Sequence, residues 1–74
     1  MAQTKHPWLD LEGPKLLARW RARKGVSQEA LAKTLELDPS QINAFENGRM
    51  RPGLDNAVRI ERHTGVAPSA WVRS

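Results

Sequence analysis

Residues 25–53 constrain this chain more than any other stretch, because two short helical patterns lie there on either side of a three-residue turn. In the first pattern, residues 28–35, Ser27 can act as a cap, and Leu31 and Leu35 form an inner apolar stripe. The second pattern restarts after the turn and runs into a basic loop. This layout predicts that the second helix is polar and protrudes from the domain.

The second helical pattern, residues 39–47, has an unusual outer face. Asp38 and Pro39 are typical of a helix start, and Gln41 at the third position can reach back to the capping residue. At about 100° per residue, Ile42 and Phe45 fall on one side. The opposite side carries small or uncharged polar residues, namely Ser40, Asn43, Ala44 and Asn47. A solvent-facing helix of this composition would be expected to carry Lys and Glu, so this face indicates close contact with a partner.

Three further helical segments flank this pair. Proline suits the first turn of a helix and glycine its end. These signals, with the apolar spacing, predict segments at 14–24 and 54–64 and a last short one opening at Pro68. Trp71 in the last segment is positioned to cover the core. The predicted fold class is therefore all-α, a compact five-helix domain without strands.

The domain organisation follows from these segments. Seventy-four residues leave room for one small domain. We place it at residues 13–74, with the helical pair at 27–48. Residues 1–12 form an N-terminal arm, which is either loosely packed or docked through its apolar side chains.

The charge balance suggests a polyanionic partner. Twelve Lys and Arg residues against eight Asp and Glu residues give a net charge of +4, and the sequence pI is 10.4. A basic surface of this kind attracts nucleic acid.

Several function classes find no support in the sequence. The chain has no cysteine, no paired His and carboxylate within a motif, and no glycine-rich phosphate loop. We therefore expect no enzyme, no catalytic residues, no metal, no cofactor and no small-molecule ligand. No apolar run approaches the ~20 residues that span a bilayer. A protein of the bacterial cytosol or nucleoid, without a membrane partner, is the expectation.

Residues 16–71 resemble the Cro-like and lambda-repressor-like helix-turn-helix proteins, which bind operator DNA. The marks of the resemblance are Gln28 opening the motif, Ala32 at the close approach of the two helices, Ile42 inside the third helix, and Glu46-Asn47-Gly48 followed by Arg49. Residues 59–65 are similar to compact prophage Cro-like regulators, a group that includes antitoxin-like members.

The resemblance implies which residues face the bases. Positions matching Pro39, Ser40 and Ala44 meet base edges in such proteins, and Asn43 lies nearby on the same face. Asn43 can pair in bidentate fashion with adenine, and the Ala44 methyl can meet a thymine methyl. For Gln41 two roles stay open, namely capping its own helix and contacting DNA.

The resemblance also implies which residues hold the DNA backbone. Gln28, with Ser27 beside it at the start of the second helix, is expected to bind a phosphate on one flank. Asn47, Arg49 and Arg51 are expected to bind phosphates on the other flank.

Two structural expectations accompany this assignment. The resemblance implies an ion pair between Arg21 and Glu46 that joins the first helix to the third. The turn of the motif usually carries a left-handed glycine where this chain has Glu36. Either Glu36 adopts that conformation at a cost of roughly 1 kcal/mol, or the turn differs.

The sequence therefore predicts sequence-specific binding of double-stranded operator DNA, with residues 39–47 in the major groove. We expect a Cro-like transcriptional repressor of phage or prophage origin that occludes a promoter. A homodimer on half-sites about 34 Å apart would supply enough contact area. Its contact surface would be the end of the fourth helix and residues 66–74.

A second interpretation belongs to a different class, namely a helical protein-interaction module such as an adaptor or antitoxin. Trp8 and Trp71 would then be exposed anchors, since tryptophan is enriched at binding hot spots. Core packing is the competing role, which we favour for Trp20 and Trp71.

Overall fold

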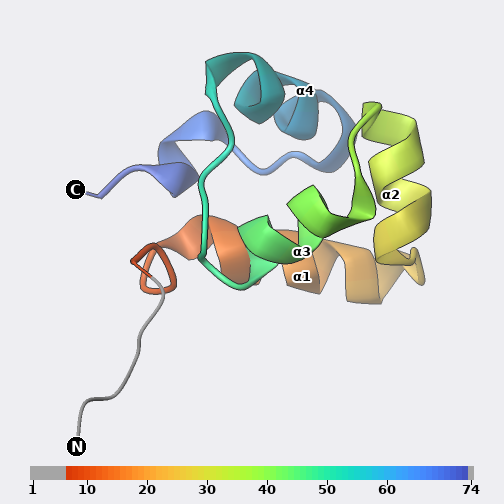
Figure 1. Ribbon diagram of the computed structural model, residues 1–74, viewed down its shortest axis with the longest axis horizontal. Helices are drawn as coiled ribbons and strands as arrows, with labels where there is room; N and C mark the ends of the chain where they lie inside the picture. Colours follow the sequence, from red (N-terminus) through yellow and green to blue (C-terminus); the bar gives the residue numbers. More distant parts are fainter. Residues whose placement is uncertain (1–6, 74) are drawn as a thin grey trace, which may run out of the picture.

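The computed structural model describes residues 7–73 and contains four α-helices, drawn in Figure 1. They are α1 (Glu12–Lys24), α2 (Gln28–Leu35), α3 (Pro39–Glu46) and α4 (Leu54–Thr64), and a 3₁₀ helix, η1 (Pro68–Trp71), follows them. Within residues 7–73 there is no strand. The all-α prediction is confirmed. Expectations for residues 1–6 of the arm, and for Ser74 at the end of the predicted domain, lie outside the described residues.

The prediction of five α-helices is wrong in its last element. η1 has only four residues, and the amides of Ala70 and Val72 donate to oxygens three positions back, those of Ala67 and Ser69. The chain leaves η1 in an extended conformation at Val72. A segment that short closes one tight turn and cannot build an α-helical ladder.

The ends of α2 and α3 follow from local capping. The Ser27 hydroxyl accepts a hydrogen bond from the Ala30 amide at 3.0 Å at the start of α2. The Gln41 side-chain oxygen accepts from the Asp38 amide at 3.0 Å, which is the capping role of the two that the sequence left open for Gln41. α3 ends at Glu46, one residue earlier than predicted.

The turn between α2 and α3 contains a strained residue. Glu36 has φ 60° and ψ 42°, and it is the non-glycine residue of the described chain with positive φ. Its amide donates to the Lys33 oxygen at 3.2 Å, and the Leu37 amide donates to the Ala32 oxygen at 2.8 Å. The turn therefore keeps the left-handed geometry that usually belongs to glycine, and Glu36 adopts it.

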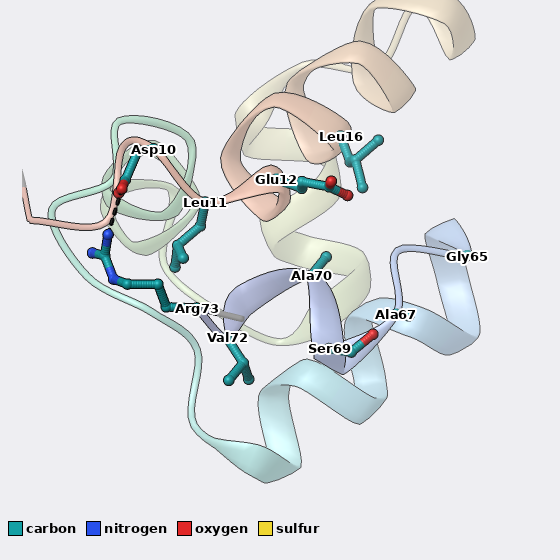
Figure 2. Close-up of a pocket in the computed structure, with 10 residues that line it drawn as sticks. All are labelled: Asp10, Leu11, Glu12, Leu16, Gly65, Ala67, Ser69, Ala70, Val72 and Arg73. Atoms are coloured by element: carbon teal, nitrogen blue, oxygen red, sulfur yellow. Dashed lines mark hydrogen bonds and ion pairs between the residues drawn. The ribbon is translucent and has the colours of Figure 1, made fainter.

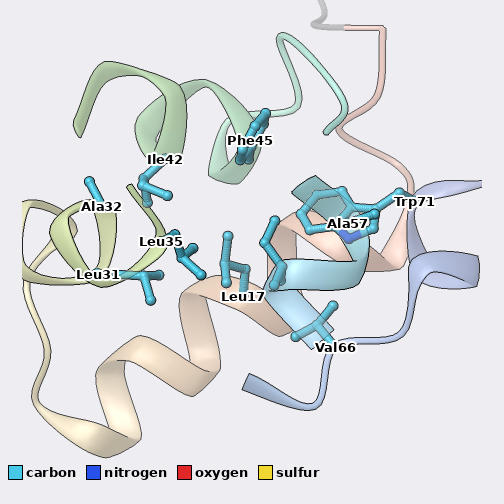
Figure 3. Close-up of a cluster of buried hydrophobic side chains, with 10 residues drawn as sticks. Leu17, Leu31, Ala32, Leu35, Ile42, Phe45, Ala57, Val66 and Trp71 are labelled. Carbon is cyan, nitrogen blue, oxygen red and sulfur yellow. The ribbon is translucent and has the colours of Figure 1, made fainter. Parts of the chain in front are cut away.

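One apolar cluster holds the helices together, and Figure 3 shows its side chains converging from α1, α2, α3, α4 and η1. Leu17, Leu35, Ile42 and Ile60 are completely buried. Trp71 is 2% exposed and packs its ring 6.0 Å from that of Phe45. Core packing is therefore the role of Trp71, and the exposed-anchor interpretation is wrong for this residue because η1 folds it inward.

The described part of the predicted arm, residues 7–12, packs against the end of α3. The Trp8 amide donates to the Gly48 oxygen at 2.9 Å, and Leu11 is buried. A Cβ on Gly48 would lie 2.4 Å from the backbone of Leu9, and its φ is +73°, so the close approach requires glycine. The segment does not cover the first turn of α3, where Ser40 is exposed.

Candidate nucleic-acid interface

The first turn of α3 is open to solvent. Pro39 and Ser40 are exposed, and Gln41 and Asn43 are half-buried. Asn47, directly after the helix, is exposed as well. Figure 1 shows α3 in front of α1 and to the left of α2, and it packs against both helices. The helix therefore presents its first turn and one polar edge, while its apolar edge enters the core.

Ala44 does not belong to this surface, and its predicted outward position is wrong. Ala44 is only 6% exposed. The chain turns back after α3, and the amides of Arg49 and Met50 donate to the Ala44 oxygen at 3.0 and 3.4 Å. The returning loop therefore lies against the last turn of α3, which a projection of the isolated helix cannot reveal.

Arg21 of α1 and Glu46 of α3 form a bidentate ion pair. Arg21 Nε lies 2.6 Å from Glu46 Oε2, and Nη2 lies 2.9 Å from Oε1. Arg21 Nη1 also donates to the Val26 oxygen at 3.0 Å. The hydrogen bonds to Glu46 raise the pKa of Arg21 above its ordinary value, although burial acts in the opposite direction. The pair braces α3 against α1.

A chain of hydrogen-bonded side chains extends from this pair to the surface. Gln28 Nε2 donates to Glu46 Oε1 at 3.1 Å, and Asn43 Nδ2 donates to Gln28 Oε1 at 3.4 Å. Asn43 Oδ1 accepts from Asn47 Nδ2 at 2.9 Å and from Arg49 Nη2 at 3.1 Å. We call the sequence Glu46, Gln28, Asn43, Arg49 the amide chain.

The amide chain, together with Asn47, which donates to Asn43, connects residues that the sequence assigned to different roles. Gln28, Asn47 and Arg49 were predicted to hold phosphates, and Asn43 was predicted to read a base. Because these side chains bind one another across α2, α3 and the following loop, they form one preorganised polar surface. No local sequence pattern links Gln28 to Asn43, because the two residues are fifteen positions apart, so this contact could not be predicted.

Two residues that were predicted to contact phosphates, Ser27 and Arg51, are not part of the amide chain. The Ser27 hydroxyl is exposed and is used as the cap of α2. The Arg51 guanidinium lies 3.9 Å above the Trp8 ring, and its Nη1 donates to the Trp71 oxygen at 3.3 Å. Arg51 therefore holds the N-terminal segment to the C-terminal one by a cation–π contact, a role that depends on the tertiary position of Trp8.

A second surface lies where residues 10–16 approach residues 65–73. A cavity of 590 Å³ lies between the start of α1 and η1. Figure 2 shows the side chains that line it, with Asp10 paired to Arg73 at one edge. Val72 is 60% exposed there. A neighbouring cavity of 460 Å³ is lined by Val72 and by Leu54, which is 75% exposed. Apolar side chains thus remain uncovered on the C-terminal segment and at the start of α4.

Between residues 7 and 73, no group of three or more His, Asp or Glu side chains is arranged to hold a metal ion. None of the helices in that range has the length and apolar character needed to cross a membrane.

Comparison with known proteins adds independent information. Residues 17–71 match a family model described as helix-turn-helix. A curated relative, multiprotein-bridging factor 1 of Candida glabrata, is 38% identical over 58 residues, which cover 78% of this chain and 38% of the relative. The chain spans 38 to 40% of the length of the curated relatives that it matches.

Two solved structures illustrate the structural likeness. The restriction-modification controller protein C.AhdI of Aeromonas hydrophila is 27% identical with a TM-score of 0.70, and the match covers 84% of this chain and 94% of that one. Hydroxypropylphosphonic acid epoxidase of S. wedmorenis is also 27% identical with a TM-score of 0.70, but only 36% of that enzyme is covered. The likeness to the enzyme thus concerns about a third of its length.

Proposed function

Because the chain belongs to the helix-turn-helix family, as its sequence indicated, we propose that it binds specific sequences in double-stranded DNA and regulates transcription without being an enzyme. In this motif the second helix enters the major groove and the first crosses the backbone. One observation carries the proposal: the exposed first turn of α3 is flanked by the polar groups of the amide chain. The finer proposal is a Cro-like repressor of phage or prophage origin that blocks a promoter by occupying it.

The phosphate contacts of this proposal lie on two flanks of α3. On one flank, Gln28 at the start of α2 keeps one amide hydrogen free after its bond to Glu46. The N-terminal end of a helix also favours an anion. On the other flank, Arg49 and Asn47 are exposed. Arg51 is a weaker candidate, since its guanidinium is already bound by Trp8.

The base contacts come from the start of α3 and from one residue a turn later. Pro39 and Ser40 are exposed, and the Ser40 hydroxyl can donate or accept a hydrogen bond. Asn43 lies at the edge of the same surface. Gln41 is occupied by capping and is a secondary candidate.

A second copy of the chain completes the proposed complex. A single domain of this size covers a small DNA surface, and two copies on half-sites about 34 Å apart double it. The uncovered Val72 side chain supports contact through the C-terminal segment, and the uncovered Leu54 side chain adds the start of α4, whereas the sequence-based expectation was the end of that helix. The dimer has the same symmetry as an inverted-repeat operator.

Selection of binding sites from random duplexes tests the proposal. We expect a short inverted repeat, and affinity that falls with salt at a logarithmic slope of about −7 if a dimer neutralises about eight phosphates. Arg49→Ala should make this slope shallower by about 0.9 per lost phosphate contact. Arg51→Ala is the matched control, with the same charge change in the same loop, and should alter the slope less. Recovery of no preferred sequence contradicts the proposal.

A protein-interaction module is the second candidate function. The name of the curated relatives, multiprotein-bridging factor, favours it, although this chain spans only 38% of such a protein. Trp8 is half-buried, and the Arg51 guanidinium lies 3.9 Å from the centre of its ring, so a partner would reach only the remaining surface of this residue. A DNA affinity that does not change with salt concentration would favour the protein-interaction module over the DNA-binding regulator.

A further inference from the structure

The two ends of the amide chain have opposite and unchangeable hydrogen-bonding polarity. The ionised carboxylate of Glu46 only accepts hydrogen bonds, and the guanidinium of Arg49 only donates them. Glu46 is held rigidly, because its side chain is 7% exposed and Arg21 donates to both of its oxygens. The inner end of the chain is therefore a fixed acceptor.

These ends determine how the two amides between them are oriented. Gln28 must turn its nitrogen toward Glu46, 3.1 Å away, which leaves its oxygen facing Asn43. Asn43 must turn its oxygen toward Arg49, 3.1 Å away, which leaves its nitrogen facing Gln28 at 3.4 Å. The acceptor at Glu46 and the donor at Arg49 require the same orientation of both amides. The orientation of Asn43 therefore follows from the chemistry of its neighbours and does not depend on which amide atom is assigned as nitrogen.

Counting donors and acceptors shows what Asn43 has left for a ligand. A side-chain amide has two acceptor positions on its oxygen and two hydrogens on its nitrogen. Asn47 and Arg49 fill both acceptor positions of Asn43, and Gln28 takes one of its hydrogens. The remaining group is a single N–H donor.

We propose that Asn43 reads the major groove as a donor only and therefore selects guanine over adenine at the base it faces. The bidentate pairing of Asn with adenine needs a free amide oxygen to accept from N6, and this oxygen is occupied. Guanine offers this N–H two adjacent acceptors, N7 and O6, whereas adenine offers one acceptor, N7, beside the N6 amino group, which is itself a donor and opposes a second donor. Thymine offers the single acceptor O4, and the cytosine amino group offers a donor and is rejected. This inference rests on the proposed DNA-binding function and replaces the adenine pairing expected from the sequence.

Arg49 has a second role in this scheme as a positioning residue for Asn43. Without its guanidinium, one acceptor position of the Asn43 oxygen becomes free, and the amide recovers the donor–acceptor pair that adenine requires. The loss of Arg49 should therefore change which base is preferred as well as how tightly DNA is bound.

The test measures the affinity of the full chain for the selected site with each base substituted in turn. For the unaltered protein we expect guanine to be favoured over adenine about fivefold at one position, the lower end of the range for a base contact. Asn43→Ala should abolish the preference at that position alone. Arg49→Met should bring the guanine-to-adenine ratio close to one there. Arg51→Met, which removes an equal charge from the same loop without touching Asn43, should leave the ratio unchanged.

Three results overturn the inference. The first is a preference for adenine at the position that is sensitive to Asn43→Ala. The second is an equal change of the guanine-to-adenine affinity ratio in Arg49→Met and Arg51→Met. In either case sequence-specific binding survives and only the donor-only reading fails. Absence of binding to every duplex overturns the proposed function and this inference together, and circular dichroism of the unaltered chain then shows whether the tested protein was folded.

Discussion

Replacing Arg21 and Glu46 separately should have unequal effects on the free energy of unfolding. Arg21→Met leaves a carboxylate that is 7% exposed with Gln28 Nε2 as its remaining donor among the contacts described. Glu46→Leu leaves a guanidinium that is 22% exposed and still donates to the Val26 oxygen. The isolated carboxylate is the more costly of the two, because it is farther from water.

The magnitudes follow from this difference in burial. Breaking a buried pair by removing one partner costs about 3–5 kcal/mol, and we expect about 3 kcal/mol for Arg21→Met because Gln28 remains. Glu46→Leu should cost about 1–2 kcal/mol, since the freed guanidinium reaches solvent. The double variant should lose about 1–2 kcal/mol, because an apolar pair of similar volume often replaces a buried ion pair with little loss. These values give a coupling energy of about 2–4 kcal/mol.

Urea unfolding followed by circular dichroism measures these differences. A domain of this length has a total stability of about 4–11 kcal/mol, so the Arg21→Met midpoint should fall markedly. Arg23→Met is the matched control on the exposed side of α1 and should stay within about 0.5 kcal/mol of the unaltered protein. Equal costs for the two single variants would refute the burial argument. A coupling energy of zero would show that the pair does not brace α3.

Three further predictions concern the turns and the ion pair. Residues 25 and 36 both adopt the left-handed conformation, so Glu36→Gly should raise the free energy of unfolding by up to about 1 kcal/mol, and Gly25→Ala should lower it by about 1 kcal/mol although no atom lies within 4 Å of the added Cβ. Thermal unfolding in which the two midpoints shift in the same direction would contradict this. Gly48→Ala should cost more than Gly25→Ala in the same assay, since its Cβ would also meet the backbone of Leu9 at 2.4 Å; equal costs would show that residues 7–12 yield easily. Because the pKa of Arg21 is raised, the contribution of the charged guanidinium to stability is fully present below the ordinary pKa of arginine and is lost only as pH rises through the raised value. The coupling energy measured by urea unfolding should therefore not weaken through deprotonation of Arg21 between neutral and mildly alkaline pH.

Much of the fold could be predicted because its signals are local. Ser27 and Asp38 precede the helices that they were expected to cap, and Gly25 ends α1 in a left-handed conformation. Capping, helix periodicity and left-handed glycine involve neighbours within about four residues, so their physics is readable in one dimension. The last predicted helix was wrong for the same local reason, since four residues sustain only a 3₁₀ turn.

The candidate site was predictable in its residue types and less so in its contacts. The sequence by itself determined a polar third helix, an excess of positive charge and a helix-turn-helix pattern, expected over residues 16–71 and matched by the family model over residues 17–71. Only the tertiary structure decided that Ala44 is buried, that Trp8 engages Arg51, and that the Glu46 carboxylate, which is 7% exposed, orients Asn43 through Gln28. The physical reason is that a side chain's free donors and acceptors are those its neighbours leave unused. Neighbours such as Gln28, which is 15 residues from Asn43 and 18 from Glu46, meet them only when the helices pack.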